Sequence, residues 1–277
     1  MSESRPASVR ELWAARYRDE REGAAHDAND TLLTLLSHRS VRAFQPRELP
    51  SGILETAIAA AQSASTSSNL QMWSVIAVSD PERKRQLAAL SGHQKHIEQA
   101  PLFLAWVLDQ SRLRRIGATR GQAADGLDYL ETFVVGAIDT ALAAQNAAVA
   151  FESFGLGIVY IGGLRNHPQQ VADVLGLPPA SVALFGMCVG YPDHGQLPAI
   201  KPRLPLEAVL HRERYDSSQE NALIGTYDRR VADYLHERGA KADAWSATVV
   251  ERVAGPDALG GRDRLREALA ERAFKLR

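Results

Sequence analysis

The longest regular pattern in the chain lies between about residues 126 and 154. Apolar residues recur there at steps of three and four, which is the spacing of one face of an α-helix. Alanine dominates residues 137–150, so a second helix can approach closely, and Gly155 follows as a natural C-terminal cap. The pattern predicts a long helix that is central to the core or lies at a dimer contact.

Four shorter segments have the composition of β-strands. Each is rich in β-branched or large apolar residues, and they cover residues 74–79, 102–108, 158–161 and 184–190. Helices are predicted around them at residues 9–21, 51–63 with Ser51 as the cap, from Pro81 onward, 219–238 and 263–274. Strands that alternate with helices predict a mixed α and β protein.

Composition narrows the class of protein. The 277 residues and 45% hydrophobic content suffice for one sizeable core, and a formal net charge of -1 favours neither a nucleic-acid nor a membrane partner. Polar residues interrupt the most apolar stretch, residues 130–151, which argues against a membrane span. The single cysteine, Cys188, excludes an internal disulfide and is expected to serve packing. With no apolar leader at the N-terminus, we expect a cytoplasmic protein.

The chain is expected to have three parts. Residues 1–30 form a charged extension or arm. Residues 31–245 form the main domain, and its last part, residues 193–245, begins with a crossing segment punctuated by prolines. Residues 246–277 form a C-terminal helical segment.

Two basic clusters have the donors that a phosphate group requires. In the first, residues 38–44 (HRSVRAF), the donors are His38, Arg39, Ser40 and Arg42. In the second, Lys201 and Arg203 flank a proline. The alternative interpretation of each cluster is a solvated basic surface.

Three further segments suit a flat, polar ligand. Residues 65–71 carry a run of hydroxyl groups, and Gln94 offers both a donor and an acceptor to the edge of a heterocycle. Gly162 and Gly163 permit close approach of the backbone to a ring. The alternatives are ordinary polar loops and a strand followed by a turn. A dinucleotide-fold fingerprint is rejected because here a helix precedes the glycines and a strand follows them, and no spacing typical of a metal site is present.

The chain resembles one branch of the nitroreductase superfamily, the oxygen-insensitive NADPH nitroreductases and NADPH-flavin oxidoreductases. It has HRSVRAF, GHQKHIEQAP, GLGIVYIGGLRN, LFGMCVGYP and KPRLP in the family order and near the family spacing, from about Leu33 to Trp245. The resemblance implies an α+β, nitroreductase-like fold with a mixed, mostly antiparallel sheet packed by helices. It also implies an intertwined homodimer with two FMN molecules at the dimer interface.

The resemblance implies roles for individual residues. The FMN phosphate would be held by His38, Arg39, Ser40, Lys201 and Arg203. Arg42 would approach the pyrimidine end of the ring, where a cation stabilises the charge that develops on reduction. The remaining contacts with the ring and ribityl chain would come from Gln94, Lys95, His96, Tyr160, Ile161, Gly162 and Gly163, together with Thr66 and Ser67 of the partner subunit.

Other positions relate to the nicotinamide and the substrate. Ser68 and Asn69 would line the substrate face, although Asn69 stands where an aromatic residue is familiar in the branch. Arg238 matches a family arginine linked to the 2′-phosphate of NADPH. The loop that follows it is shorter than in the branch and lacks a second arginine, so Lys241 is the candidate substitute and NADH stays open as a donor.

The expected activity is that of an FMN-dependent NAD(P)H oxidoreductase. It would pass two electrons by a ping-pong mechanism to small oxidised molecules such as nitroaromatics, quinones or free flavins. The flavin carries the chemistry, so no catalytic residue is required, and Asp109, Asp125 and Asp139 are expected to be caps or solvated residues. The alternatives are a same-fold flavin enzyme of different chemistry (flavin fragmentation or dehalogenation), a non-enzymatic flavin-binding module, and a basic-patch protein without flavin.

Overall fold

The computed structural model describes residues 8–19, 29–241 and 243–277. The chain divides into two compact units: unit 1 comprises Met1–Arg39 and Ala199–Leu259, and unit 2 comprises Ser40–Pro198 and Gly260–Arg277. This division differs from the predicted boundaries at residues 30 and 245, which stay predictions. The helix predicted at residues 9–21 ends at Tyr17, because Arg18 is left-handed with φ 49°; residues 20 and 21 lie outside the described residues.

Unit 2 contains a four-stranded sheet. Its strands are β1 (Trp73–Val78), β2 (Leu102–Asp109), β3 (Gly157–Ile161) and β4 (Ser181–Gly190), and they lie in the order β1-β2-β4-β3. All neighbouring strands pair antiparallel, and one isolated parallel bridge joins Ser40 to Ile158. The predicted mixed, mostly antiparallel sheet is confirmed.

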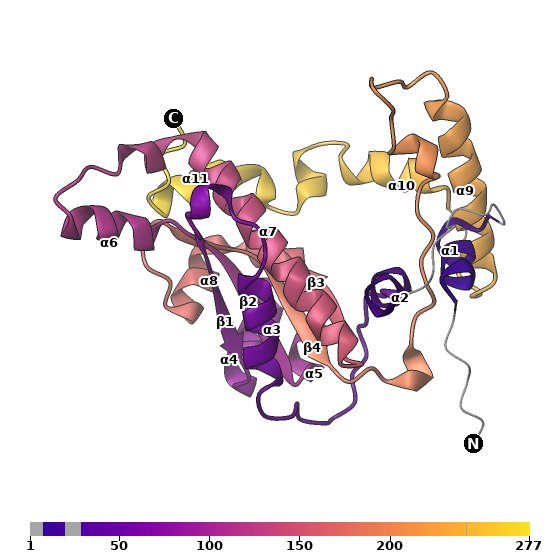
Figure 1. Cartoon of the computed structure of the whole chain (residues 1–277), viewed down its shortest axis with the longest axis horizontal. Coiled ribbons are helices and arrows are strands. Elements are labelled where there is room, and N and C mark those ends of the chain that lie inside the picture. Colours follow the sequence, from indigo (N-terminus) through magenta and orange to yellow (C-terminus); the bar gives the residue numbers. More distant parts are fainter. Residues whose placement is uncertain (1–7, 20–28, 242) are drawn as a thin grey trace. The chain divides into compact units, whose positions relative to one another are not determined.

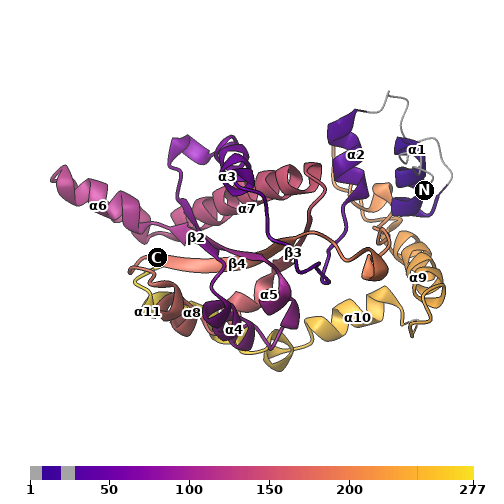
Figure 2. The same ribbon diagram turned by 90° about the horizontal axis from the view of Figure 1, so that it is seen from below.

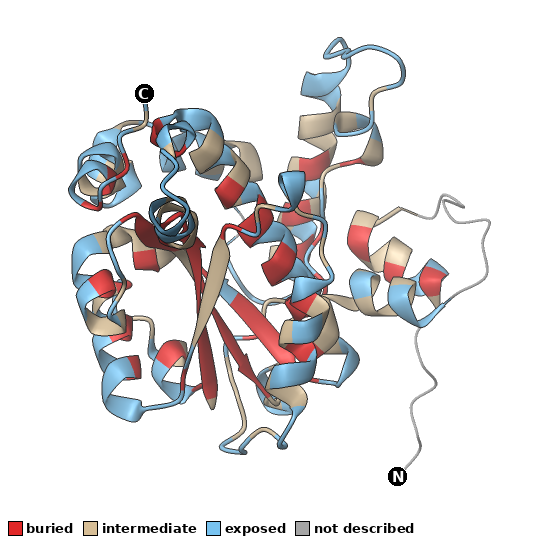
Figure 3. Cartoon of the chain, turned by 60° about the vertical axis from the view of Figure 1, so that its left-hand side comes forward, coloured by how far each residue is buried: buried red, intermediate tan, exposed pale blue. Residues whose placement is uncertain are grey.

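Helices cover both faces of this sheet. Helices α3 (Ile53–Gln62) and α7 (Leu130–Ser153) lie on one face, and α4 (Pro81–Leu90) and α8 (Pro168–Leu175) lie on the other (Figures 1 and 2). The two faces follow from the alternation of side chains along a strand. In β2, residues 102, 104 and 106 pack in the α3–α7 layer, whereas residues 103, 105 and 107 pack in the α4–α8 layer. Buried residues therefore fill the whole length of β2, as the red strands of Figure 3 show.

Helices α3 and α7 approach each other through alanines. Ala57 and Ala61 of α3 belong to the same buried cluster as Ala143 and Ala147 of α7. The Asn146 amide also donates to the carbonyl of Ala60 at 3.2 Å. Among the helices of the described residues, α7 alone has the length and apolar composition of a membrane span, and one side of it packs on α3 and the sheet.

The C-terminal residues of unit 2 close over the end of the sheet. The buried side chain of Phe274 packs edge-on against Phe133 of α7, with ring centroids 5.5 Å apart. The carboxylate of Asp128, just before α7, accepts from Lys275 at 2.7 Å and from Arg114 at 3.0 Å. Arg277 donates its backbone N–H to the carbonyl of Asp128 at 2.9 Å. One buried carboxylate thus joins the chain terminus to α6 (Ser111–Thr119), the helix that carries Arg114.

Unit 1 consists of helices and an irregular segment. Its helices are α1 (Val9–Tyr17), α2 (Asp30–Ser37), α9 (Glu220–His236) and α10 (Trp245–Arg252). Arg230 of α9 pairs with Asp19, which follows α1, at 3.1 Å. The side chain of Asp228 accepts from the backbone and hydroxyl of Ser246, so α9 fixes the start of α10.

The structure corrects several predicted elements. Gly52, at a left-handed φ of +85°, precedes α3 in place of the predicted cap Ser51. Helix α7 begins at Leu130, after a separate 3-10 turn at Asp125–Asp128. Gly155, with φ +76°, follows the helix as predicted. Five short helices were not predicted: α2, α5 (Lys95–Gln99), α6, α8 and α10.

The anchoring of the C-terminus depends on the charge of Asp128. Hydrogen bonds from Lys275 and then Arg114 lower the pKa of this carboxyl. A lowered folded-state pKa contributes stability that is present above about pH 4 and is lost as the pH falls through the folded value. We expect Asp128→Asn to reduce the free energy of unfolding at pH 7 and to flatten its dependence on pH below pH 5. Urea denaturation at several pH values measures both, with the exposed Asp125→Asn as the control.

Candidate functional site

Two of the predicted flavin-binding segments lie against each other in unit 2. They are residues 91–96, before and within α5, and residues 160–163, at the end of β3; we call them the ring-edge segments. A Cβ atom on Gly163 would lie 2.5 Å from the carbonyl oxygen of Ser91 and 2.9 Å from the side-chain nitrogen of Gln94. Both distances are shorter than any real contact of a Cβ atom, so position 163 accepts glycine alone without a shift of the backbone.

The first ring-edge segment presents an unpaired imidazole nitrogen. Within the described part of the chain, the buried Nε2 of His96 has no hydrogen-bond partner. Burial lowers the pKa of His96, and the charge of Arg42 lowers it further, so the imidazole is neutral at neutral pH. The Gln94 amide donates to the carbonyl of Ser91 at 2.7 Å, and Lys95 is exposed at the start of α5. A buried polar atom without a partner is uncommon in a folded protein, and a polar ligand at this edge accounts for it.

The second ring-edge segment offers its backbone rather than its side chains. Ile161 is 1% exposed and packs in the layer of α4 and α8. The Tyr160 hydroxyl donates to Gln145 of α7 at 3.3 Å, and its ring packs edge-on against Phe185. Because both side chains are engaged, the groups that remain for a ligand are the peptide units of residues 160–163. Together the ring-edge segments fit the edge of a flat heterocycle such as the FMN ring.

Residues 66–71 form a strained loop that is anchored to α7. Ser68, Asn69 and Gln71 all have positive φ values, between 49° and 54°, which are uncommon for residues other than glycine. The buried carboxylate of Asp139 accepts from the Thr66 hydroxyl at 2.5 Å and from the Ser67 backbone at 3.0 Å. Asp139 is therefore a buried anchor of this loop and is not solvated. Among the described residues, no hydrogen bond joins Thr66 or Ser67 to the ring-edge segments of their own chain.

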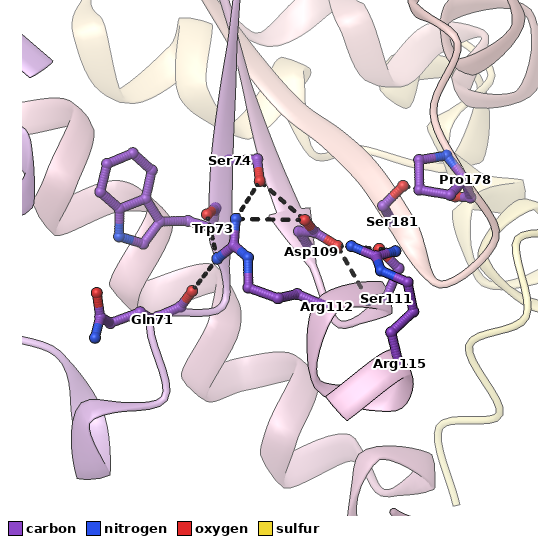
Figure 4. Close-up of polar contacts among 9 residues, drawn as sticks. All are labelled: Gln71, Trp73, Ser74, Asp109, Ser111, Arg112, Arg115, Pro178 and Ser181. Carbon is purple, nitrogen blue, oxygen red and sulfur yellow. Dashed lines mark hydrogen bonds and ion pairs between the residues drawn. The ribbon is translucent and has the colours of Figure 1, made fainter. Parts of the chain in front are cut away.

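Asn69 lines a pocket of about 590 Å³ beside β1. Arg112 of α6 also lines this pocket. It donates to the carbonyls of Gln71 and Trp73 at 2.8 and 3.2 Å (Figure 4). Its other nitrogen donates to the Ser74 hydroxyl and lies 3.7 Å from Asp109. Burial alone raises the pKa of Asp109, but hydrogen bonds from Ser111 and Ser74 and the charge of Arg112 outweigh it and lower the pKa. Asp109 is thus a buried anchor between β1 and α6 and is not solvated.

The second basic cluster lies in unit 1 on the irregular segment at residues 199–203. Two tyrosines of α9 hold this segment: the Tyr227 hydroxyl donates to the carbonyl of Pro202 at 2.9 Å, and the Tyr234 hydroxyl donates to that of Ala199 at 3.4 Å. The side chains of Lys201 and Arg203 are exposed. His38 and Arg39 belong to the same unit, whereas Ser40 and Arg42 belong to unit 2.

Arg39 and Arg238 line one pocket of about 440 Å³ in unit 1. The guanidinium of Arg238 lies 4.1 Å from the centre of the Tyr234 ring and donates to the carbonyl of Tyr234 at 3.1 Å. Arg18, from the end of α1, also lines the pocket and forms a 2.5 Å ion pair with Glu237. Lys241 is strongly exposed and pairs with Asp243 at 3.1 Å. Three guanidinium groups and one carboxylate therefore border this pocket.

Sequence reasoning missed three arginines at these places: Arg16, Arg18 and Arg112. Arg112 is revealed only by the fold, because its partners lie about 40 residues away in β1. Arg16 had a detectable pattern, since it shares the helical face of Val9 and Leu12 and is buried with them. An arginine on the apolar face of a helix indicates a buried partner.

Two family models match this chain. The model described as the nitroreductase family matches residues 35–191, and the model described as the nitroreductase family C-terminal domain matches residues 201–277. A curated relative from Bacillus subtilis named FMN reductase (NADPH) is 40% identical over 227 residues, which cover 80% of this chain and 90% of the relative. The oxygen-insensitive NADPH nitroreductase of Salmonella typhimurium is 40% identical over 218 residues, covering 78% of this chain and 88% of the relative.

Solved structures give the same result. The NfrA1 nitroreductase of Bacillus subtilis matches with a TM-score of 0.83 and 38% identity, covering 88% of this chain and 99% of that one. The NADPH:FMN oxidoreductase of Vibrio harveyi, solved in complex with NAD+, matches with a TM-score of 0.80 and 36% identity, covering 90% of this chain and 100% of that one. The sequence, the sheet order and these relatives agree, and the chain belongs to the nitroreductase family.

Proposed function

We propose that the protein is an FMN-dependent NAD(P)H oxidoreductase that transfers electron pairs to small oxidised molecules such as nitroaromatics, quinones or free flavins. The observation that carries the proposal is the contact between the two ring-edge segments, beside a buried imidazole nitrogen that lacks a partner. The names of the relatives, FMN reductase (NADPH) and oxygen-insensitive NADPH nitroreductase, support the same activity.

The protein's part is to bind and orient the flavin. Bound FMN would supply the redox chemistry, namely acceptance of a hydride from the reduced nicotinamide and delivery of two electrons to the second substrate, with protons from solvent. We propose that the ring edge is contacted by the peptide units of residues 160–163, the Gln94 amide and the neutral His96. Lys95 is proposed to contact the ribityl chain. Arg42 is exposed near His96, and its charge favours the anionic reduced ring. His38, Arg39, Ser40, Lys201 and Arg203 are proposed to hold the phosphate.

Arg238, which lines the pocket of unit 1, is proposed to bind the 2′-phosphate of NADPH. Arg238 is fixed by its own helix end, through the Tyr234 ring and the Tyr234 carbonyl. A pre-positioned guanidinium loses less freedom when it binds a phosphate than a free side chain does. Lys241 is paired with an aspartate and exposed, so it is assigned a lesser part in NADPH binding. NADH is proposed as the weaker donor.

A homodimer is proposed from the exposed side of α7. Leu130, Val134, Ile138 and Leu142 follow one another at steps of four residues and are 42–52% exposed. These residues form a single apolar stripe along the helix, and an exposed apolar stripe of this length is typical of an interface. A second copy of the chain is the proposed partner, and Thr66 and Ser67 of the partner subunit are proposed to complete each flavin site.

We also propose that the enzyme is located in the cytoplasm.

The visible spectrum of the purified protein is the primary test. We expect the purified protein to show flavin absorption bands. In the absence of oxygen, NADPH is expected to bleach these bands quickly and NADH more slowly. Addition of a nitroaromatic or a quinone should then restore the bands. Arg238→Ala is expected to raise the KM for NADPH about 5-fold or more and to leave that for NADH within a factor of two, because an exposed ion pair with phosphate contributes about 1 kcal/mol.

Other outcomes of this test are informative. Bound flavin that neither nucleotide reduces identifies a flavin-binding module. Reduction without transfer to any acceptor favours a same-fold enzyme of different chemistry. A colourless protein that does not bind added FMN overturns the proposal.

The anchor of the strained loop is expected to matter for both stability and activity. Asp139→Ala leaves the Thr66 hydroxyl and the Ser67 N–H without their acceptor, and each such loss costs about 1–3 kcal/mol when the group is shielded from water. We expect a lower free energy of unfolding and a reduced reductase rate at saturating FMN. Asp125→Ala, an exposed aspartate close by in the chain, is the control, and an unchanged rate in Asp139→Ala would show that the loop is not part of the site.

The exposed stripe of α7 gives a test of the dimer. Ile138→Asp places a charge in the centre of the stripe, where burial of an unpaired charge is unfavourable. We expect the wild-type protein to have twice the mass of one chain in light scattering after gel filtration, and the variant to have the mass of one chain and to release FMN. Glu131→Lys on the same helix is the matched control. A wild-type protein that runs as a monomer refutes the proposed dimer.

A further inference from the structure

Arg16, on the helix α1, is a buried cation in unit 1. Arg16 is 7% exposed, and its guanidinium donates to three backbone carbonyls. These belong to Lys201 at 3.0 Å, Leu36 at 2.9 Å and His38 at 3.0 Å. The side chain thus contacts two chain segments that are more than 160 residues apart in the sequence.

The backbone of Arg16 continues this connection. Its carbonyl oxygen accepts from the backbone N–H of Arg203 at 2.9 Å. One residue therefore holds Lys201 with its side chain and Arg203 with its main chain, while it also holds His38. These are residues of the two basic clusters to which binding of the FMN phosphate is assigned above.

The chemistry of arginine suits this position. A guanidinium carries five N–H donors in a rigid plane, so it satisfies several carbonyls at fixed angles, whereas a lysine ammonium is a compact charge on a flexible stem. Carbonyl oxygens at the end of a helix, such as that of Leu36 in α2, and in irregular segments need such donors because no helical turn or sheet satisfies them. Removal of Arg16 leaves the carbonyls of residues 36, 38 and 201 without this donor and frees both segments to move.

We propose that Arg16 is a positioning residue for the FMN phosphate: it fixes the backbone of His38, Lys201 and Arg203, the phosphate-binding candidates of unit 1 that it contacts. The inference rests on the proposed function and deepens it. Helix α1 precedes both ranges that the family models match, residues 35–191 and 201–277. Helix α1 therefore contributes to the site a residue from outside these two ranges.

The test compares FMN with riboflavin, which has the same ring and ribityl chain but no phosphate. Apoprotein of the full chain is titrated with each flavin, and the quenching of flavin fluorescence gives the two Kd values. In Arg16→Met and Arg16→Lys we expect the Kd for FMN to rise about 10-fold or more, while the Kd for riboflavin changes less than about 2-fold. Met, Lys and Arg have similar helix propensities, so both variants preserve α1.

The same two Kd values, for FMN and for riboflavin, are measured for a control variant, and they also decide whether the inference is wrong. Arg10→Ala changes an exposed arginine of α1 and is expected to leave both Kd values unchanged. An equal rise for FMN and riboflavin in the Arg16 variants, or no rise for either, overturns the positioning role while the proposed function stands. If the wild-type protein itself binds neither flavin, the proposed function fails and this inference fails with it. Circular dichroism of each variant identifies unfolding, and Arg16→Lys then decides the outcome if Arg16→Met does not fold.

Discussion

The arrangement of unit 2 depends on the complete burial of strand β2. Every one of its eight residues is buried, so each face of the strand needs its own layer of helices. Leu104 and Trp106 point into the alanine-rich contact of α3 and α7, and Phe103 points into the layer of α4 and α8. Burial on this scale is the main source of stability in a domain of this size. The ring-edge segments extend from elements packed on this core, since one follows α4 and the other ends β3.

Close approach of the backbone is a second consequence of that core. Gly186 of β4 faces Phe103, and a Cβ atom there would lie 2.2 Å from the ring. Gly157 at the start of β3 faces Val41 in the same way, at 2.7 Å. Glycine therefore lets a large side chain or a neighbouring strand occupy space that a Cβ atom would take. At Gly163 the absence of a Cβ atom lets the two ring-edge segments lie against each other. Packing of the core and the proposed binding of a ligand therefore both require glycine at particular positions.

The sequence predicted the elements whose pattern is long or whose composition is distinctive. The period of α7, closed by Gly155, and the apolar run of β2 identified these two elements to within a few residues. Short helices with mixed composition were missed: α6 has three arginines and one threonine among its nine residues, and its contacts with β1 and Asp128 become visible only in the fold. The role of Asp139 was also beyond local pattern, because its partners, Thr66 and Ser67, lie more than 70 residues away. Family resemblance supplied the candidate flavin residues, yet it had no place for Arg16, which lies before the matched ranges.

Buried arginine is the device by which this chain fixes its irregular segments. Arg272 near the C-terminus donates to the carbonyls of Leu177, Pro178 and Ser181, just as Arg16 donates to three carbonyls in unit 1. Lys84 shows what an ammonium achieves instead: it reaches two carbonyls, and burial lowers its pKa. A guanidinium stays charged under the same burial and offers more donors in a fixed plane. Only five of the chain's 32 lysine and arginine residues are lysines, so guanidinium is its common cation, and Arg16 and Arg272 show how that group can hold the backbone of an irregular segment.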